Sequence, residues 1–292
     1  MSNSEHYDVL VLGSGEAGKF TAWTSAKEGL KTGVIERGLI GGSCPNIACL
    51  PSKNIIHSAK VADFACRAAE FGVRSGRAMV DMAAVRHRKR QMVEGLVAMH
   101  LDRYHASGAE LIMGQGRFVA AKTIEVHLDS GDTRTLYGDR VCLNTGTSAA
   151  IPDVPGLVDA KPLTHIQAME LDRLPEHLLV LGGGYMGLEL GQAFARFGSR
   201  VTILQRGPQL LSREDADVAA AVLQFLREDG IEVQLQTKVT AVEGHSGARS
   251  IRRDRTFSKA PTYWSPPGGS PILEASDSKP PASRWASADI SG

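Results

Sequence analysis

The chain has 292 residues, which is enough for about two domains that each bury a hydrophobic core. Its 33 Lys and Arg balance 32 Asp and Glu, so the net charge of +1 argues against nucleic acid or an anionic membrane as the main partner. The sequence has no apolar run close to the roughly 20 residues that span a bilayer, and its N-terminus lacks the features of a secretion signal. We therefore expect a cytoplasmic protein that acts on small molecules.

The first elements follow a strand–helix–strand pattern. The apolar run Tyr7–Leu12 predicts a strand, Lys19–Lys27 predicts a helix, and Thr32–Ile35 predicts a second strand that ends at Glu36. Parallel strands joined by a helix are typical of the α/β class.

The turn between this first strand and its helix is rich in glycine. Gly13 allows a tight turn, Gly15 lets the backbone approach a pyrophosphate, and Gly18 allows the helix to pack closely on the strand. The helix N-terminus adds the positive end of its dipole, and Glu36 can accept a hydrogen bond from a ribose hydroxyl. The pattern predicts a dinucleotide site, and an ordinary glycine-rich turn is the alternative.

Two of the four cysteines lie close together in the segment Gly41–Lys53. Cys44 and Cys49 are separated by four residues, so their sulfurs can meet on one side of a helix whose first turn is distorted. Near a helix N-terminus the dipole lowers the pKa of a thiol, so we predict a reactive redox pair. A zinc site with two further ligands, or two inert buried thiols, are the alternatives. We expect Cys66 and Cys142 to be inert thiols of the core.

The middle of the chain predicts two long helices, strands, and then a repeat of the first pattern. Asn54–Ala69 and Met82–His105 have helical periodicity, and Ala109–Asn144 alternates like short strands. The strand–glycine turn–helix–strand pattern then returns about 170 residues after its first occurrence. Its elements are the strand Leu178–Leu181, the turn at 182–187, the helix Leu188–Phe197 and the strand Val201–Leu204.

This repeat predicts a second dinucleotide site. Gly182, Gly184 and Gly187 occupy the turn, and the next strand ends at Gln205 and Arg206. A carboxylate at that strand end would bind an unmodified ribose and repel a 2′-phosphate, whereas an amide beside an arginine suits the phosphate. We therefore expect NADPH, with NADH as the alternative because exposed arginines are common.

The three motifs, in this order, resemble those of the class I flavin-dependent pyridine nucleotide–disulfide oxidoreductases, the family of mercuric reductase, dihydrolipoamide dehydrogenase and glutathione reductase. The resemblance covers residues 6–245. It implies an α/β fold with two Rossmann-like domains, an FAD-binding domain at 1–150 and an incomplete NAD(P)-binding domain at 151–245. It also implies FAD at the first glycine turn and NAD(P)H at the second.

The resemblance assigns roles to individual residues. Cys49 resembles the thiol that contacts the flavin, and Cys44 resembles the interchange thiol that attacks the substrate. Lys53 and Glu189 resemble an ion pair near the flavin, although a surface lysine and a helix-facing glutamate would account for them equally well.

Two further segments carry the resemblance. Residues 143–147 resemble the family's crossover segment, which would place Thr145, Gly146 and Thr147 at the cofactor. Residues 114–116 resemble its flavin-side turn and add Gly116 to the expected cofactor contacts.

The sequence also departs from the family pattern. Pro45 replaces an aliphatic residue in a first-turn position that tolerates proline, and Ala48 replaces a glycine. The family's second FAD segment has no counterpart here, nor has its dimerisation domain with the His-Glu pair that donates and accepts protons. We therefore expect a C-terminally truncated chain whose intact parent is a homodimer.

The resemblance implies that hydride passes from NAD(P)H through FAD to a Cys44–Cys49 disulfide, and from there to a small-molecule disulfide or a soft metal ion. We expect no nucleic-acid or membrane partner. A truncated remnant without catalysis and a flavin reductase that uses no thiols are the alternatives.

The last stretch, 246–292, lacks apolar periodicity and contains six of the 13 prolines, which predicts a disordered tail. Codons for Tyr263–Leu273, read one base earlier, can encode Leu-Leu-Val-Ala-Ala-Gly-Arg-Ile-Pro-Asn-Thr, which resembles the family's segment at that place. We therefore expect a frameshift near His245–Arg255. The nucleotide sequence tests this hypothesis, because stop codons or unrelated residues in the earlier frame would contradict it.

Overall fold

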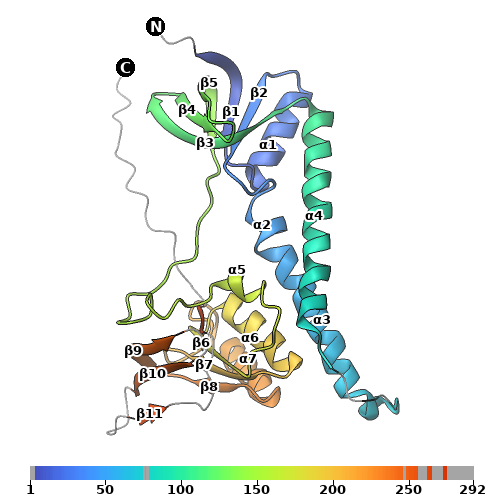
Figure 1. Ribbon diagram of the computed structural model, residues 1–292, viewed down its shortest axis with the longest axis vertical. Coiled ribbons are helices and arrows are strands. Elements are labelled where there is room, and N and C mark those ends of the chain that lie inside the picture. The colour runs from blue at the N-terminus through green and yellow to red at the C-terminus, as the bar shows by residue number, and fades with distance from the viewer. Residues whose placement is uncertain are drawn as a thin grey trace. The chain divides into compact units, whose positions relative to one another are not determined.

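The computed structural model describes the backbone of residues 4–74, 76, 79–245, 248–255, 262–264 and 272–274, and side chains as far as residue 244. The chain divides into two compact units (Figure 1). The first contains Met1–Ile55 and Ala84–Gly146, and the second contains Ile56–Ala83 and Thr147–Gly292. The domain limits expected at 150 and 245 stay predictions.

Five strands form the first unit's sheet, which closes into a ring (Figure 1). β1 pairs in parallel with both β2 and β5, β2 pairs in parallel with β3, and β3, β4 and β5 form an antiparallel meander. The strands are β1 (Glu5–Leu12), β2 (Thr32–Glu36), β3 (Glu110–Ala120), β4 (Thr123–Leu128) and β5 (Thr133–Leu143).

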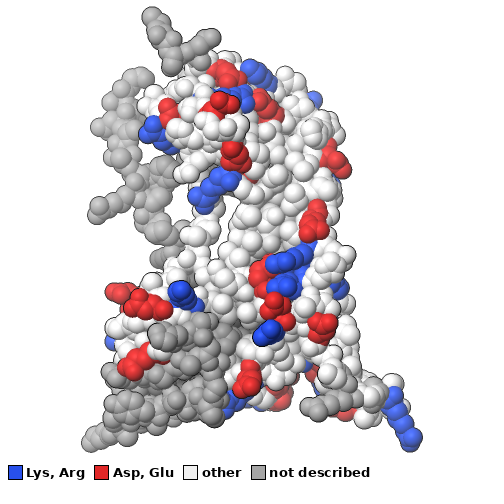
Figure 2. Space-filling model, viewed as in Figure 1, with Lys and Arg blue, Asp and Glu red and all other residues white. Residues whose placement is uncertain are grey.

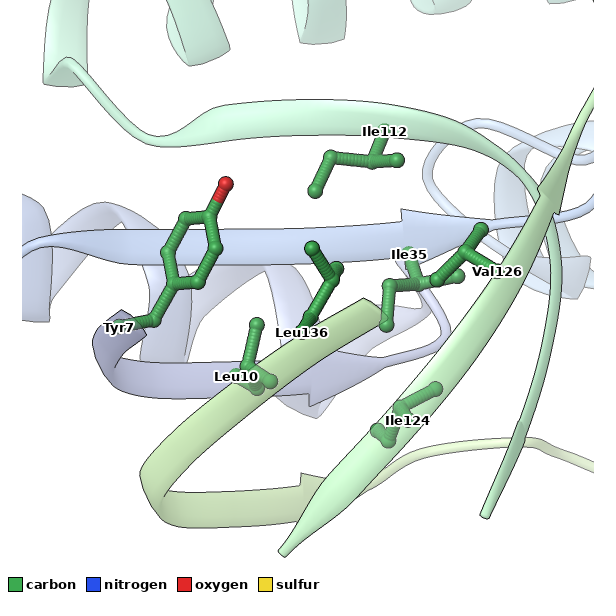
Figure 3. Close-up of a cluster of buried hydrophobic side chains, with 7 residues drawn as sticks. All are labelled: Tyr7, Leu10, Ile35, Ile112, Ile124, Val126 and Leu136. Carbon is green, nitrogen blue, oxygen red and sulfur yellow. The ribbon is translucent and has the colours of Figure 1, made fainter. Parts of the chain in front are cut away.

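A cluster of apolar side chains fills the interior of this ring (Figure 3). Burying one such side chain contributes about 1.5–3 kcal/mol, so the cluster is a main source of the unit's stability. Its members come from all five strands, and they are Tyr7, Leu10, Ile35, Ile112, Ile124, Val126 and Leu136.

A second cluster joins the outer side of β1 and β2 to the helices. Val9, Val11 and Val34 pack with Ala22 and Trp23 of α1, and the cluster continues to Tyr104 and Ala109. The helices in this part of the sequence are α1 (Glu16–Lys27), α2 (Ser43–Asn46), α3 (Cys49–Cys66) and α4 (Met82–Ser107), and the short 3-10 helix η1 (Ala68–Phe71) follows α3.

The second unit contains a four-stranded parallel sheet in the order β12-β6-β7-β8, and a three-stranded antiparallel sheet of β9, β10 and β11. Its core includes Leu157, Leu179, Leu181, Leu204 and Val242. The elements up to the second sheet are α5 (His165–Ala168), β6 (His177–Leu181), α6 (Tyr185–Phe197), β7 (Arg200–Leu204), α7 (Ala216–Glu228), β8 (Glu232–Gln234) and β9 (Thr237–His245).

The predicted α/β fold with two related units is confirmed. Both glycine turns connect a strand to a helix, and each first strand pairs in parallel with the strand that follows. One difference is that α3 begins at Cys49, before the predicted start at Asn54. Pro51 lies in its first turn, where the missing N–H of proline has no partner to lose.

The predicted disordered tail lies mostly outside the described residues. Within it the structure describes strands, β10 (Ala248–Arg255), β11 (Thr262–Trp264) and β12 (Ile272–Glu274), so regular backbone replaces the expected irregular chain there. β12 pairs in parallel with β6, as β5 pairs with β1 in the first unit. Strand pairing uses main-chain groups, which is why it can form where the side-chain pattern is weak.

A buried histidine at the start of β6 makes the second unit sensitive to acid. His177 is 3% exposed, its Nδ1 accepts a hydrogen bond from Arg200 at 2.8 Å, and its Nε2 lies 2.9 Å from the Thr202 hydroxyl, which donates to Glu232. Burial and the Arg200 charge lower the pKa of His177 to about 4. The neutral imidazole of His177 is therefore the form that this buried position stabilises.

Because the unfolded pKa of histidine is about 6.5, the stability that His177 contributes is complete above that pH and is lost as the pH falls toward 4. Between pH 6.5 and pH 4 we expect the protonation of this group to lower the free energy of unfolding of the second unit by about 3 kcal/mol. Urea unfolding between pH 7 and 4 measures it, and His177→Gln should flatten the slope. An equal slope in wild type and variant would show that other groups carry the pH dependence.

Among the residues that the structure describes, none of the helices is long and apolar enough to cross a bilayer. On the face seen in Figure 2, acidic and basic side chains are interspersed, without a broad region of one sign.

Candidate functional site

The first glycine turn connects β1 to α1 in a conformation that requires glycine. Gly13 has a φ of +102°, and a Cβ there would lie 2.2 Å from the Asn144 carbonyl oxygen. A Cβ on Gly18 would lie 2.2 Å from the Gly13 carbonyl oxygen, and one on Gly15 would lie 2.8 Å from the Asn144 amide nitrogen. At these three positions the backbone carries no side chain, and a pyrophosphate can therefore approach it closely.

Glu36 lies at the end of β2 with its carboxylate buried against this turn. One oxygen accepts from the Ser14 amide at 2.9 Å and the Ser14 hydroxyl at 2.6 Å, and the other accepts from the Gly38 and Leu39 amides. Burial alone would raise the pKa of Glu36, but these four hydrogen bonds hold it below its usual value. The carboxylate is ionised and fixed. Its predicted contact with a ribose hydroxyl stays a prediction.

The segment before the cysteines packs directly on the glycine turn. A Cβ on Gly42 would lie 2.4 Å from the Gly15 Cα, and the Gly41 amide donates to the Ser14 hydroxyl at 3.0 Å. Both Gly41 and Gly42 have positive φ, which other residues rarely adopt. The glycine pair therefore brings the start of α2 against the predicted cofactor turn.

Cys44 and Cys49 lie on two separate helices. Cys44 is half-buried in α2, Cys49 is exposed at the start of α3, and Ile47 and Ala48 break the helix between them. Both cysteines are free thiols, and Cys49 is near enough to Cys44 to raise the pKa of its thiol. A helix break lies between the two cysteines in place of the expected distorted turn, and the redox pair itself stays a prediction. Pro45 lies in the single turn of α2.

The expected lowering of the pKa at Cys44 is wrong for this form of the chain. Burial, the neighbouring Cys49 thiol and the charge of Glu16 raise the pKa of Cys44 to about 11, and Lys19 acts in the opposite direction. α2 has only four residues, so its dipole contributes little to a thiolate. The expectation for the other two thiols is also wrong in part, because Cys66 is exposed and Cys142 is only half-buried.

The second glycine turn repeats the first in the second unit. The Gly13 amide donates to the Ile35 carbonyl at 2.8 Å, and the Gly182 amide donates to the Leu204 carbonyl at 2.9 Å. Gly182 has a φ of +99°, close to that of Gly13, and Gly184 is the N-cap of α6, on which Gly187 is buried.

Gln205 occupies in the second unit the place that Glu36 has in the first. Its Oε1 accepts from the Gly183 amide at 3.0 Å, and its Nε2 donates to the Gln209 carbonyl at 3.0 Å. Arg206 and Arg213 follow in the same loop, and both are exposed. The loop therefore combines a neutral amide with two cationic side chains.

Other predicted site residues are not gathered at these turns. Residues 114–116 lie inside β3, so the expected turn is wrong, and a Cβ on Gly116 would meet Leu12, Ile35 and Ile124 of the core. Any contact of Gly116 with a cofactor stays a prediction.

The crossover segment follows β5 directly, and Thr145, Gly146 and Thr147 are exposed there. Lys53 is exposed on α3 in the first unit, whereas Glu189 is half-buried on α6 in the second. The ion pair expected between them stays a prediction.

FAD fits the first turn. In the described part of the chain no side chain caps α1, so the amides of its first turn are open to phosphate oxygens, and the three glycines leave room for the backbone of the turn to approach them. α6 likewise begins without a side-chain cap from the described residues, which suits a second dinucleotide. Among the same residues there is no group of three or more His, Cys, Asp or Glu that could hold a metal ion.

Sequence reasoning missed two residues that shape the first turn. The Asn144 amide donates to the Gly13 carbonyl at 3.2 Å, and its backbone N–H donates to the Leu12 carbonyl at 2.8 Å. Ser14 joins the turn to Glu36 and Gly41. The sequence carries no local signal for either role, because Asn144 acts on a residue that lies 131 positions earlier in the chain.

The comparisons with known proteins agree with this geometry. The family model described as pyridine nucleotide-disulphide oxidoreductase matches residues 7–260. Mercuric reductase from Streptomyces lividans is 38% identical over 239 residues, which are 81% of this chain and 50% of that protein. Mitochondrial dihydrolipoyl dehydrogenase from Pisum sativum is 30% identical over 246 residues, which are 83% of this chain and 49% of that protein.

Among solved structures, the Cu(II) complex of the HOCl-induced flavoprotein disulfide reductase RclA from Escherichia coli superimposes with a TM-score of 0.78 and 28% sequence identity. The match covers 93% of this chain and 56% of RclA. The chain thus spans about half the length of the relatives it matches.

Proposed function

The chain belongs to the pyridine nucleotide-disulphide oxidoreductase family, and we propose that it binds FAD and NAD(P)H and reduces a disulfide or a soft metal ion through Cys44 and Cys49. One observation carries this proposal. The segment that bears the thiols packs on the first glycine turn at Gly42 and Gly15, and Cys49 is near enough to Cys44 to raise the pKa of its thiol. A dithiol held beside a dinucleotide turn is the arrangement that thiol–disulfide chemistry at a flavin requires.

The turn with Gly13, Gly15 and Gly18 would hold FAD, and the turn with Gly182 and Gly184 would hold the nicotinamide nucleotide. Bound FAD supplies the hydride acceptor that converts two-electron reduction by NAD(P)H into reduction of the Cys44–Cys49 disulfide. The predicted contact of Thr145, Gly146 and Thr147 with the cofactor is part of the same proposal.

A disulfide substrate would react with the two thiols in two steps. Cys44 Sγ, as thiolate, attacks one substrate sulfur, which forms a mixed disulfide and releases the other sulfur as a thiol. Cys49 Sγ then attacks Cys44 Sγ, which re-forms the protein disulfide and releases the second thiol. The two protons that Cys44 and Cys49 lose pass to the two product thiols.

A soft metal ion is the second substrate class that this pair suits, because thiolates are the ligands that such ions prefer. The relatives support it, since one is named mercuric reductase and the RclA structure is a Cu(II) complex. We propose that a full-length protein of this kind acts in the cytoplasm as a homodimer, with small molecules as its substrates.

For the nicotinamide nucleotide we propose NADPH in preference to NADH. Gln205 brings no negative charge to the strand end, and the exposed Arg206 and Arg213 lie in the loop that follows it. Arginine matches a phosphate with several donors in a fixed plane.

Replacing Arg206 and Arg213 by alanine together should weaken NADPH binding about 10- to 100-fold, as expected for lost charge-assisted hydrogen bonds, and leave NADH binding within about twofold. Fluorescence titration of the purified chain measures both. Arg227→Ala, an exposed arginine at the end of α7, is the matched control. An equal loss for both nucleotides would contradict a role in reading the 2′-phosphate.

The visible spectrum of the purified chain tests the proposed function. The chain is incubated with FAD, freed from unbound flavin by gel filtration, and measured before and after addition of NADPH. We expect retained flavin absorbance and, on reduction, a long-wavelength charge-transfer band that Cys49→Ser removes. Failure to retain flavin would favour the alternative of a remnant without catalysis. Retained flavin that NADPH reduces without such a band would favour a flavin reductase that uses no thiols.

A further inference from the structure

A lysine is buried beside the redox segment, where neither the core nor the dinucleotide turn requires one. Lys19 lies on α1 and is 4% exposed. Its Nζ donates to Glu16 Oε1 at 2.6 Å and contacts His100 Nε2 at 2.8 Å. A buried ammonium group is costly unless it is paired and hydrogen-bonded, so the fold maintains this charge through specific partners.

His100 accepts a hydrogen bond from Lys19 and is therefore a neutral ring. Its Nδ1 lies 2.5 Å from the Leu96 carbonyl oxygen, which can only accept, so Nδ1 carries the hydrogen and Nε2 is left as an acceptor for Lys19. The ring is 3% exposed and lies 3.1 Å from the position that a Cβ on Gly41 would take. His100 therefore connects the lysine to the segment that carries Cys44.

The contact of Gly42 with Gly15 brings the start of α2 to the start of α1. Glu16 begins α1, and Lys19 lies one turn later, so both charges are close to Cys44. Their effects on the pKa of Cys44 are opposite, since Glu16 disfavours the thiolate and Lys19 favours it. The groups that face Cys44 are thus Cys49 from α3 and this pair from α1, with His100 of α4 behind the lysine.

We propose that Lys19 is a positioning residue for the redox pair: held by Glu16 and His100, its ammonium group supplies a positive charge that favours the thiolate form of Cys44, the form that attacks the substrate. Glu16 opposes this charge and has the larger effect of the two on Cys44. The inference rests on the proposed function only for the identity of Cys44 as the attacking thiol. A thiolate reacts and a thiol does not, so the charge sets the pH above which Cys44 is active.

Alkylation of Cys44 measures this directly and needs neither FAD nor turnover. In a Cys49→Ser background, Cys44 Sγ displaces iodide from iodoacetamide, which forms a carbon–sulfur bond and releases its proton to solvent. The rate is followed from pH 6 to 11 by mass spectrometry of the peptide that contains Cys44. Below the midpoint the rate is proportional to the fraction of thiolate, so the displacement of the curve along the pH axis gives the shift of the midpoint. The probe is iodoacetamide alone, applied to the full chain.

We expect Lys19→Met to move the midpoint of the rate upward by about half to one pH unit, and Glu16→Gln to move it downward by a similar amount. Lys27→Met, the same change on an exposed residue about 12 Å further along α1, should leave it unchanged. Shifts of opposite sign are the signature of charge, because loosened packing would change both variants in the same direction.

Equal midpoints in all variants, or shifts of one sign, would overturn the proposal. If Lys19→Met does not fold, Glu16→Gln decides, because Glu16 is half exposed and its replacement leaves the core intact. Failure to bind flavin would defeat the proposed function without touching this result, whereas unshifted midpoints in a chain that binds flavin would defeat this inference alone.

Discussion

Gly13→Ala is expected to destabilise the first unit by about 3–5 kcal/mol and to abolish FAD binding. The φ of +102° costs a residue with a side chain about 1–2 kcal/mol, and the new Cβ would lie 2.2 Å from the Asn144 carbonyl oxygen. That oxygen belongs to the backbone and cannot turn away. Removing this steric overlap would require β5 to move away from β1, and residues Glu5 to Leu12 of β1 all lie in the stretch that pairs with β5.

Gly29→Ala is the matched control for this prediction. Gly29 has a φ of +86°, similar to that of Gly13, but a Cβ there would meet nothing within 4 Å. The Gly29→Ala variant should therefore lose only the stability that the positive φ costs an alanine, about 1–2 kcal/mol, and should still bind FAD.

Urea unfolding is followed by the fluorescence of Trp23. This residue of α1 is buried in the cluster that contains Val9 of β1 and Tyr104 of α4, so its fluorescence reports on the first unit. Trp264 and Trp285 are replaced by phenylalanine in every sample, so that Trp23 alone is observed. Equal losses for Gly13→Ala and Gly29→Ala would show that the close packing of the turn does not contribute.

Features that depend on local backbone geometry could be predicted from the sequence. Gly13 and Gly182 mark turns because a glycine placed directly between an apolar strand and a helix is typical of a tight connection, and both have positive φ. The positions of Glu36 at the end of β2 and of Gln205 directly after β7 are predictable for the same reason. Strand length and the spacing of the motif together allow few positions for the residue that ends the strand. In both units the residue after the first glycine donates its N–H to that strand-end side chain.

Features that depend on contacts distant in sequence could not be predicted in this way. The sequence predicts a turn at Gly116, but this residue lies in the middle of β3, where the ring of strands leaves no space for a side chain. The sequence also predicts a lowered pKa for Cys44, but burial and Cys49 raise it. Both outcomes depend on which side chains the fold brings close, and periodicity contains no information about that.

The same limit applies to Lys19, whose burial has no signal in the sequence. A lysine just after a glycine motif is ordinarily on the exposed side of a helix, and the burial of Lys19 depends on His100, which lies 81 residues further along the chain. Asn144 is similar, because its contact with Gly13 spans 131 residues. Long-range polar partners of this kind depend on the tertiary fold and have no local pattern in the sequence.

Replacing Cys44 by serine is expected to lower the rate of disulfide or metal-ion reduction by the FAD-loaded chain by about 10³-fold or more, because serine cannot form the mixed disulfide through which the electron pair passes. Reduction of an artificial dye that accepts electrons directly from flavin should stay within about twofold of wild type. Cys49→Ser should show the same contrast, since Cys44 then has no partner to resolve the mixed disulfide. The comparison therefore separates thiol chemistry from simple flavin reduction.

Cys66→Ser provides the control, because Cys66 is an exposed free thiol at the end of α3 and lies outside the pair. It should leave both rates unchanged. A thiol count completes the experiment: the oxidised wild-type chain should lose two reactive thiols relative to the reduced chain, and the Cys44→Ser chain should lose none. If both cysteine variants retain full acceptor reduction, electrons leave the flavin by another route, and the contact between the two thiols serves only the packing of α2 on α3.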